Sequence, residues 1–408
     1  MSQPSSPCVA TSKGPRRPAR SQIPGSTSRE SPPASVAAEV PAPPDVPAPA
    51  QVPAPAHVAA PVVPPGAGLA PVPGGVIRQR SLGPFELENG STLPELTIAY
   101  RHDGPAWPAP QVLVVHALTG SSDAAGDWWA PLIGPGRALD TARVGVLCAN
   151  LLGGCYGTTG PTSIDPGTGD PYGARFPSVT VRDQARAQLA LLDALGVGHL
   201  AAVVGGSLGG MVALEVALER PGFTATAIPI AAPAATGAMA LAWNHLQLEL
   251  IDRLGDGGLE LARQLAMTTY RSETDFGTRF GRHLRPDGRF EVTGYLEHQG
   301  RKLLDRFDAE TYRTLVRAMD SHDVGRGRGG TEAAFRSFAA AGTEVLGVGI
   351  EGDILYGPEQ VREVVRIATS AGCKARYREI RSTKGHDAFL VEWDQLDVIL
   401  GEALAVLS

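Results

Sequence analysis

The sequence predicts an α/β fold in which a mostly parallel central sheet is interrupted by an inserted helical lid. From residue 111, short strand-like runs alternate with longer segments of helical periodicity; the alternation stops at Pro233 and resumes near residue 343. Strands that alternate with helices are typical of βαβ units, whose strands lie parallel. We therefore expect a core built from 76–232 and 343–408, with a lid of helices at 233–342 between its two parts.

The first 75 residues differ from the rest in composition. They hold 19 of the 35 prolines and are rich in alanine, as in PAPPDVPAPAQVPAPAHVAAPVVPP at 41–65. Such a segment cannot bury enough apolar surface to offset the entropy of ordering. We expect a disordered Pro/Ala-rich extension over 1–75, and one large domain in the remainder, which is long enough for a sizeable core.

The elements of the core follow in order along the chain. Strands are predicted at 112–116, 144–149, 200–204, 224–231, 345–350 and 375–380, and helices at 180–195, 207–220, 358–370 and 395–406. In the first helix Val181, Ala185, Leu189 and Leu192 recur at spacings of three and four, with Thr180 as the expected N-cap. The segment 233–342 is mostly helical and more charged, without a clear strand.

The charge, the hydropathy and the cysteine spacing argue against a nucleic-acid-binding, a membrane-spanning or a metal-binding protein. The formal net charge is −6 without basic blocks, which gives no support to nucleic-acid binding. No run approaches the roughly 18 apolar residues of a membrane span, and the four cysteines show no metal-ligand spacing. We expect a soluble, cytoplasmic protein that binds no nucleic acid, no membrane and no metal.

The sharpest local motif is GGSLGG at 205–210, between a predicted strand and a predicted helix. It matches G-x-S-x-G, the turn that exposes a nucleophilic serine in the α/β-hydrolase fold. Ser207 is the candidate nucleophile, and the Leu208 N–H at the helix start can donate to an oxyanion. The alternative is a glycine-rich turn with an N-capping serine. A phosphate loop is disfavoured because its lysine is absent.

A serine nucleophile needs a base and an acid, which in this fold follow it in the order acid, then histidine. His386 is the one histidine after Asp353, in the loop STKGHDAF, and both Glu351 and Asp353 follow the strand ending at 350. Asp353 lies further into its loop and is the better candidate. Taken singly, each residue also fits a solvated loop position; in this order they predict a Ser207–Asp353–His386 triad.

A second oxyanion donor is expected in the loop after the early strand. The segment HALTG at 116–120 lies there, and the Leu118 backbone N–H is the candidate. His116 itself is expected to be structural.

Taken together, the motifs resemble those of the homoserine O-acyltransferases of the α/β-hydrolase superfamily, over nearly all of 80–408. The matching blocks are HALTG at 116–120, WWAPLIGPGRALDT at 128–141, NLLGGCYGTTGP at 150–161, VVGGSLGGM at 203–211, ARQLAMTTYRS at 262–272, HDVGRGRGG at 322–330 and KGHDAFLVE at 384–392. Several separated blocks in the same order are far more specific than a serine elbow alone.

The resemblance also implies substrate-binding residues. Arg263 matches the family's arginine for the substrate carboxylate, Tyr270 a tyrosine of the same cleft, and Asp387 the acid that contacts the substrate amine. An amino-acid substrate needs a fixed cation and a fixed anion, and the arginine fork suits a carboxylate. The residues alone do not select these three positions, since polar side chains on a helix or loop are most often solvated.

The reaction implied by the resemblance is ping-pong acyl transfer from an acyl-CoA co-substrate to L-homoserine, a step toward methionine, without a cofactor. Acetyl is favoured over succinyl because the glycine-rich loop near Tyr156 offers no obvious cation for a distal carboxylate. The family implies a homodimer. The alternatives are homoserine O-succinyl transfer, serine O-acyl transfer, a carboxylesterase or thioesterase, and a non-catalytic binding module.

Overall fold

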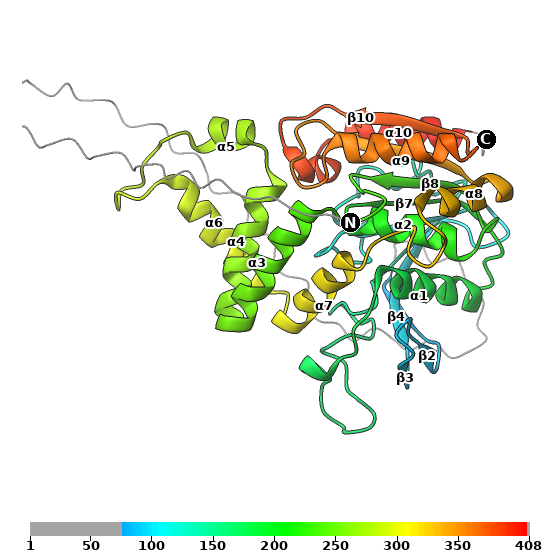
Figure 1. Ribbon diagram of the computed structural model, residues 1–408, viewed down its shortest axis with the longest axis horizontal. Coiled ribbons are helices and arrows are strands. Elements are labelled where there is room, and N and C mark those ends of the chain that lie inside the picture. Colours follow the sequence, from blue (N-terminus) through cyan, green and yellow to red (C-terminus); the bar gives the residue numbers. More distant parts are fainter. Residues whose placement is uncertain (1–75, 406–408) are drawn as a thin grey trace, which may run out of the picture. The chain divides into compact units, whose positions relative to one another are not determined.

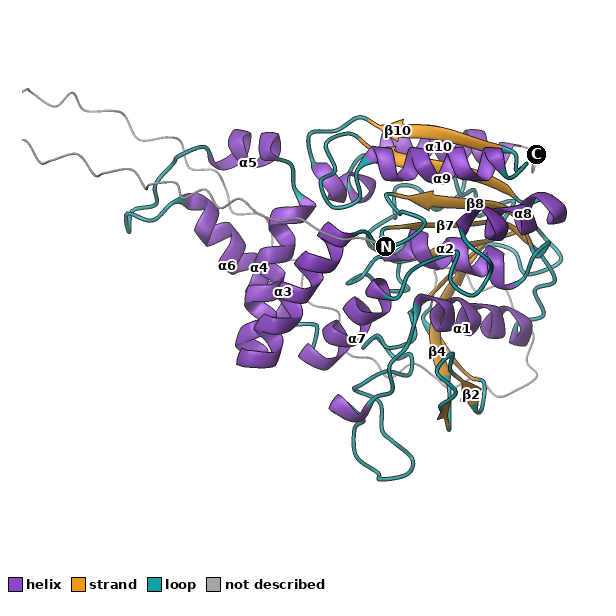
Figure 2. Ribbon diagram, in the orientation of Figure 1, coloured by secondary structure: helices purple, strands orange, loops and turns teal. Residues whose placement is uncertain are grey.

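The computed structural model describes residues 76–405 (Figures 1 and 2). The predicted disordered extension at 1–75 lies outside the described residues. Within the described range, no helix is long and apolar enough to cross a membrane.

The strands form a mostly parallel sheet, which confirms the predicted α/β-hydrolase fold class. The sheet has eight strands in the order β1-β4-β6-β5-β7-β8-β9-β10. Only the β1–β4 and β4–β6 pairs are antiparallel. The strands are β1 (Arg78–Ser81), β4 (Thr97–Asp103), β5 (Gln111–Val115), β6 (Gly145–Ala149), β7 (Leu200–Gly206), β8 (Thr224–Ile230), β9 (Glu344–Ile350) and β10 (Ala375–Ile380), and β2 (Phe85–Glu86) and β3 (Thr92–Leu93) form a separate pair.

Helices cover both faces of this sheet, which explains why its central strands are apolar throughout. On β5, Leu113 and Val115 pack into the cluster that contains α1 (Val181–Ala194) and α2 (Leu208–Glu219). Val112 and Val114 pack into the opposite cluster with α10 (Trp393–Leu404). Successive strand residues point to opposite faces, so one apolar run serves two cores.

The predicted start of α1 is confirmed in detail. Thr180 is the N-cap: its side chain accepts a hydrogen bond from the Asp183 N–H, while the Asp183 carboxylate accepts one from the Thr180 N–H. This reciprocal capping satisfies two backbone donors that the first turn leaves without partners.

The excursion after β8 is helical, as predicted. Its helices are α3 (Ala238–Leu254), α4 (Asp256–Tyr270), α5 (Glu273–Phe280), α6 (Glu291–Leu304), α7 (Ala309–Asp320) and α8 (Thr331–Ala341). The first five pack mainly with one another, to the left of the sheet in Figure 1. By contrast, α8 packs on α2 and on α9 (Pro358–Ser370). The domain boundaries stay predictions, and the contacts of α8 favour ending the lid before Thr331.

Candidate active site

Ser207 occupies a strained turn between β7 and α2. Its φ of 58° and ψ of −125° lie in a region that non-glycine residues rarely adopt. Its N–H donates to the Ile230 carbonyl at 2.9 Å, which ties the turn to β8. A Cβ on Gly205 would lie 2.4 Å from the Gly209 carbonyl, and one on Gly209 would lie 2.2 Å from the Val115 oxygen. The two glycines therefore allow the close packing that holds the serine in place.

Asp353 and His386 are in direct contact. Phe389 from the His386 segment packs on the serine turn, where a Cβ on Gly206 would lie 2.5 Å from its ring. His386 lies in a short 3₁₀ helix, η2 (Gly385–Leu390), and its Nδ1 lies 2.7 Å from Asp353 Oδ2. The other carboxylate oxygen of Asp353 accepts the Leu355 and Tyr356 N–H groups at 2.8 and 3.0 Å. Glu351, the alternative acid, is exposed. Among the described residues, His386 Nε2 has no hydrogen-bond partner, Ser207 Oγ included; such contacts are often long in free enzymes.

The environment of His386 favours its protonated form. Burial lowers the pKa of the imidazole, but the charge of Asp353, the hydrogen bond to it and the charge of Asp387 outweigh burial and raise the pKa above the ordinary value. Asp353 also fixes the tautomer, with the proton on Nδ1 and Nε2 free to accept. The pair has the arrangement of a general base held by a buried carboxylate.

The two backbone N–H groups predicted for the oxyanion hole are not used elsewhere within the described residues, and their role stays a prediction. Neither the Leu118 nor the Leu208 N–H has a hydrogen-bond acceptor among residues 76–405. His116, by contrast, is fully used: its Nδ1 bonds the Ala117 carbonyl at 2.8 Å and its Nε2 accepts the Leu151 N–H at 3.0 Å. Burial lowers the pKa of His116 to about 4, so the ring is neutral and structural.

The three residues implied for substrate binding lie around His386. The guanidinium of Arg263 stands 5.3 Å from the Tyr270 ring centroid, and the Tyr270 ring lies 5.8 Å from that of His386. Within the described part of the chain, Arg263 forms no ion pair with a carboxylate; it hydrogen-bonds the Tyr270 side chain, and its charge also acts on Asp387. Asp387 is paired instead with Arg271, at 3.2 Å. The roles of all three stay predictions.

Two arginines near the site were missed by the sequence analysis. Arg271 directly follows Tyr270 in a block that was singled out, but no periodicity indicated its pairing with Asp387. Arg306 precedes α7, and its Nη1 donates to the Thr119 carbonyl and to the Tyr156 hydroxyl, both at 2.7 Å. The glycine-rich loop itself supplies no cation, but Arg306 brings one to Tyr156 from another segment, so the sequence argument for acetyl over succinyl does not hold. Arg306 and Tyr156 are 150 residues apart in the sequence, and local sequence patterns do not indicate contacts over such a separation.

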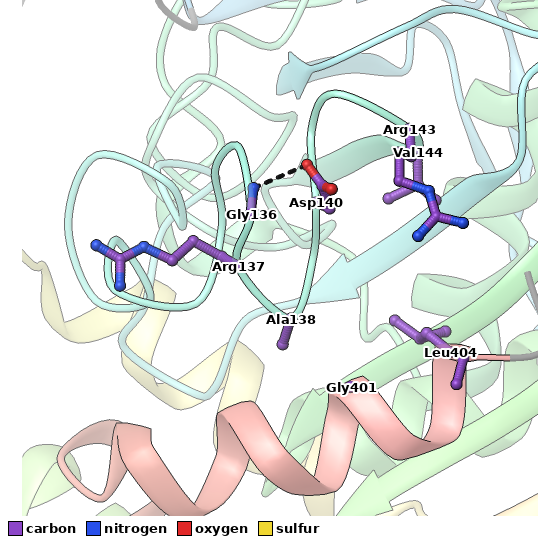
Figure 3. Close-up of a pocket in the computed structure, with 9 residues that line it drawn as sticks. Gly136, Arg137, Ala138, Asp140, Arg143, Val144, Gly401 and Leu404 are labelled. Atoms are coloured by element: carbon purple, nitrogen blue, oxygen red, sulfur yellow. Dashed lines mark hydrogen bonds between the residues drawn. The ribbon is translucent and has the colours of Figure 1, made fainter. Parts of the chain in front are cut away.

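A surface pocket of about 260 Å³ lies away from these residues (Figure 3). Gly136, Asp140 and Arg143 on one side and Gly401 on α10 on the other line it. It adjoins Val144, at the start of β6, whereas Ser207 follows the end of β7, and both strands run parallel to β5. The pocket therefore lies at the amino-terminal ends of the parallel strands, whereas Ser207 lies at their carboxyl ends, so the pocket has no part in the candidate site.

The strand order, the serine elbow and the acid and histidine after β9 and β10 define the chain as an α/β-hydrolase-fold protein. The profile of the alpha/beta hydrolase fold family matches residues 110–390. Esterase E22, a solved structure with a TM-score of 0.73, shares this fold at 23% identity, over 81% of this chain and all of its own.

More similar relatives narrow the family. A homoserine O-acetyltransferase of Moorella thermoacetica is 47% identical over 78% of this chain and 92% of its own length. The crystal structure of a homoserine O-acetyltransferase from Staphylococcus aureus is 32% identical, with a TM-score of 0.69, and the match covers 81% of this chain and 95% of that one. The chain belongs to the homoserine O-acetyltransferase family, which confirms the resemblance found in the sequence.

Proposed function

We propose that this protein transfers an acetyl group from acetyl-CoA to the γ-hydroxyl of L-homoserine, through an acetyl-enzyme on Ser207. The observation that carries the proposal is 47% identity to a homoserine O-acetyltransferase over 92% of that protein's length. The Asp353–His386 hydrogen bond and the strained turn at Ser207 support a covalent route. The product would serve methionine biosynthesis, in the cytoplasm.

The first half-reaction acetylates the serine. His386 Nε2 takes the proton of the Ser207 hydroxyl as Oγ attacks the thioester carbonyl. The Leu118 and Leu208 N–H groups stabilise the tetrahedral oxyanion. When the C–S bond breaks, CoA leaves as the thiol with the proton that His386 had taken.

The second half-reaction reverses these roles. His386 removes the proton of the homoserine γ-hydroxyl, whose oxygen attacks the acetyl carbonyl. The bond to Ser207 Oγ breaks, the serine regains a proton from His386, and O-acetylhomoserine leaves. Metal and redox chemistry have no place in this scheme, so acetyl-CoA is the one co-substrate that we propose.

The charged groups around His386 suit an amino acid. We assign Arg263 to the carboxylate of homoserine, because its guanidinium is not committed to a protein carboxylate in the described range. Asp387 takes the ammonium group, and Tyr270 lies between Arg263 and His386 and closes the cleft over the acceptor. A fixed cation and a fixed anion also orient the hydroxyl toward the acetyl carbon.

We propose acetyl as the acyl group because the cation near Tyr156 already has protein partners. Arg306 is a cation near Tyr156, but one of its nitrogens already donates to both Thr119 and Tyr156. We propose that it holds the loop of the oxyanion donor Leu118 rather than a succinyl carboxylate. The Arg306→Gln variant should then slow turnover of acetyl-CoA and keep acetyl-CoA preferred over succinyl-CoA.

Hydrolysis is the second candidate, because esterase E22 has the same fold. Water would then replace homoserine as the acceptor. The presence of both Arg263 and Asp387 near His386 favours transfer, since water as the acceptor needs neither charge.

We also propose a homodimer formed through the lid. Large apolar side chains are exposed on α3 and α4: Met239, Leu246, Leu254 and Leu261. Exposed apolar surface on neighbouring helices favours an interface. Light scattering of the purified chain would show a single-chain mass if the proposal is wrong.

One assay tests the activity. Purified protein is mixed with acetyl-CoA or succinyl-CoA, with and without L-homoserine or L-serine, and free CoA thiol is followed. We expect release that requires homoserine and is fastest with acetyl-CoA. Release of CoA that is independent of the acceptor would mean hydrolysis. No release of CoA by folded protein would refute the proposal that the chain is an enzyme of this class.

A further inference from the structure

The segment that carries His386 is docked on the junction between lid helices α4 and α5. The Ser272 hydroxyl donates to the Thr383 carbonyl, and Lys384 Nζ lies 2.9 Å from Asp275 Oδ1. A Cβ on Gly385, whose φ is +70°, would lie 2.7 Å from the Ser272 nitrogen. The lid therefore contacts the three residues that precede the histidine, through backbone as well as side chains.

Asp275 is the centre of this junction. Its side chain is 1% exposed, and three cations surround it: Lys384 at 2.9 Å, Arg279 at 3.3 Å and Arg271 at 3.9 Å. A buried carboxylate is retained only where charges and hydrogen bonds compensate for its lost hydration. These groups restrict one another, so the guanidinium of Arg271 is held in place on the side of Asp275.

The other side of Arg271 faces the candidate acceptor site. Its Nη2 lies 3.2 Å from Asp387 Oδ2, and both side chains are largely buried. The ion pair is made through Oδ2, which leaves Oδ1 to be offered to a substrate ammonium. Arg271 Nε is buried and has no acceptor among the described residues.

Resting on the function proposed above, we propose that Arg271 is a positioning residue: bridging Asp275 and Asp387, it fixes the Asp387 carboxylate for the ammonium group of the acceptor amino acid. It would act through Asp387 and not touch the reacting atoms. The consequence is a division of labour between neighbouring arginines, with Arg263 for the carboxylate of the acceptor and Arg271 for the anion that holds its amine.

The charges around Asp387 support this role. Burial raises the pKa of its carboxyl, while Arg271 is the strongest opposing charge, followed by Arg263 and His386; Asp353 acts in the same direction as burial. An ammonium group binds the ionised carboxylate. Without Arg271, Asp387 would be both less fixed and harder to ionise.

The test separates the two half-reactions in the full-length protein. For Arg271→Gln, we expect the KM for L-homoserine to rise tenfold or more, roughly the loss of one charge-assisted contact. The single-turnover rate of CoA release on mixing with acetyl-CoA alone should change far less than the KM, because Asp387 acts on acetylation only through its charge near His386. Arg271→Lys restores the charge without the fork and should recover part of the lost affinity.

Two further variants make the result specific. Arg279→Gln is the matched control, because it removes another cation from Asp275 without contacting Asp387, and its KM for homoserine should remain near wild type. In an Asp387→Asn background, Arg271→Gln should add almost nothing to the KM, since partners in one interaction are not additive. If Arg271→Gln does not fold, the Lys variant and its own double variant with Asp387→Asn carry the same test.

The proposal is overturned if Arg271→Gln lowers the acetylation rate by as large a factor as it raises the KM for L-homoserine. Arg271 would then stabilise the lid in general and not position Asp387. It is also overturned if the effects of Arg271→Gln and Asp387→Asn multiply. Failure of the proposed function would look different: wild-type protein itself would then show no CoA release that depends on homoserine.

Discussion

Ser207 and Asp353 stand on segments that the central sheet fixes by close packing, whereas Arg263 and Tyr270 belong to lid helix α4. Around the serine, glycines allow backbone contacts that no side chain could make, and every residue of β7 is buried. The junction that follows α4 meets the core through hydrogen bonds and ion pairs, centred on Asp275. Changes in the core should therefore alter acetylation, and changes in the lid should alter use of the acceptor.

The largest effect is expected from Asp353→Asn in the core. An amide in place of the carboxylate leaves the shape nearly intact but no longer stabilises the imidazolium or its tautomer. We expect the single-turnover rate of acetylation to fall about 10³- to 10⁴-fold, with little change in the melting temperature. A loss of less than tenfold in the rate of CoA release would remove Asp353 from the proposed triad.

Two glycine substitutions compare the packing of the regions directly. Gly209→Ala in α2 places a Cβ 2.2 Å from the Val115 oxygen and should lower the free energy of unfolding by about 2 to 3 kcal/mol. Gly277→Ala in lid helix α5 meets no atom within 4 Å and should raise it by about 0.5 to 1 kcal/mol. Denaturant titration measures both. Equal effects would contradict the distinction between the two regions.

In the lid, Arg263→Gln should weaken the binding of homoserine without lowering the rate of acetylation. Loss of a charge-assisted pair with the homoserine carboxylate should raise KM roughly 10- to 100-fold. Steady-state kinetics with homoserine as the varied substrate provides the test, and the single-turnover release of CoA is the control. An unchanged KM would assign the carboxylate to another group.

The smallest effect concerns pH. His386 must be neutral to accept a proton, and the charges of Asp353 and Asp387 raise its pKa against the effect of burial. The acetylation rate should therefore fall as pH drops, with a midpoint above the ordinary histidine value of about 6.5. A midpoint below that value would contradict the balance of charges seen here.

The difference between the regions also explains what the sequence could predict. The strands from β5 to β10 were predicted to within about two residues, because apolar runs and glycine turns are local signals. β1 and β4 were missed, since RQRS is polar throughout and TIAYRHD mixes polar and apolar residues; β1 is the edge strand and β4 lies next to it. Ser207, Asp353 and His386 could be predicted because each follows the end of a recognisable strand. The roles of Arg271 and Arg306 depend on contacts between segments that are distant in the sequence, and such contacts leave no periodic pattern.

The central claim is that acetyl passes through Ser207 to homoserine. Intact-mass and peptide mass spectrometry after mixing the protein with acetyl-CoA alone tests it most directly, followed by addition of L-homoserine. We predict one acetyl group on Ser207, discharged much faster by homoserine than by water or by L-serine. Turnover without this adduct, or an adduct that homoserine does not discharge faster than water, would contradict the account.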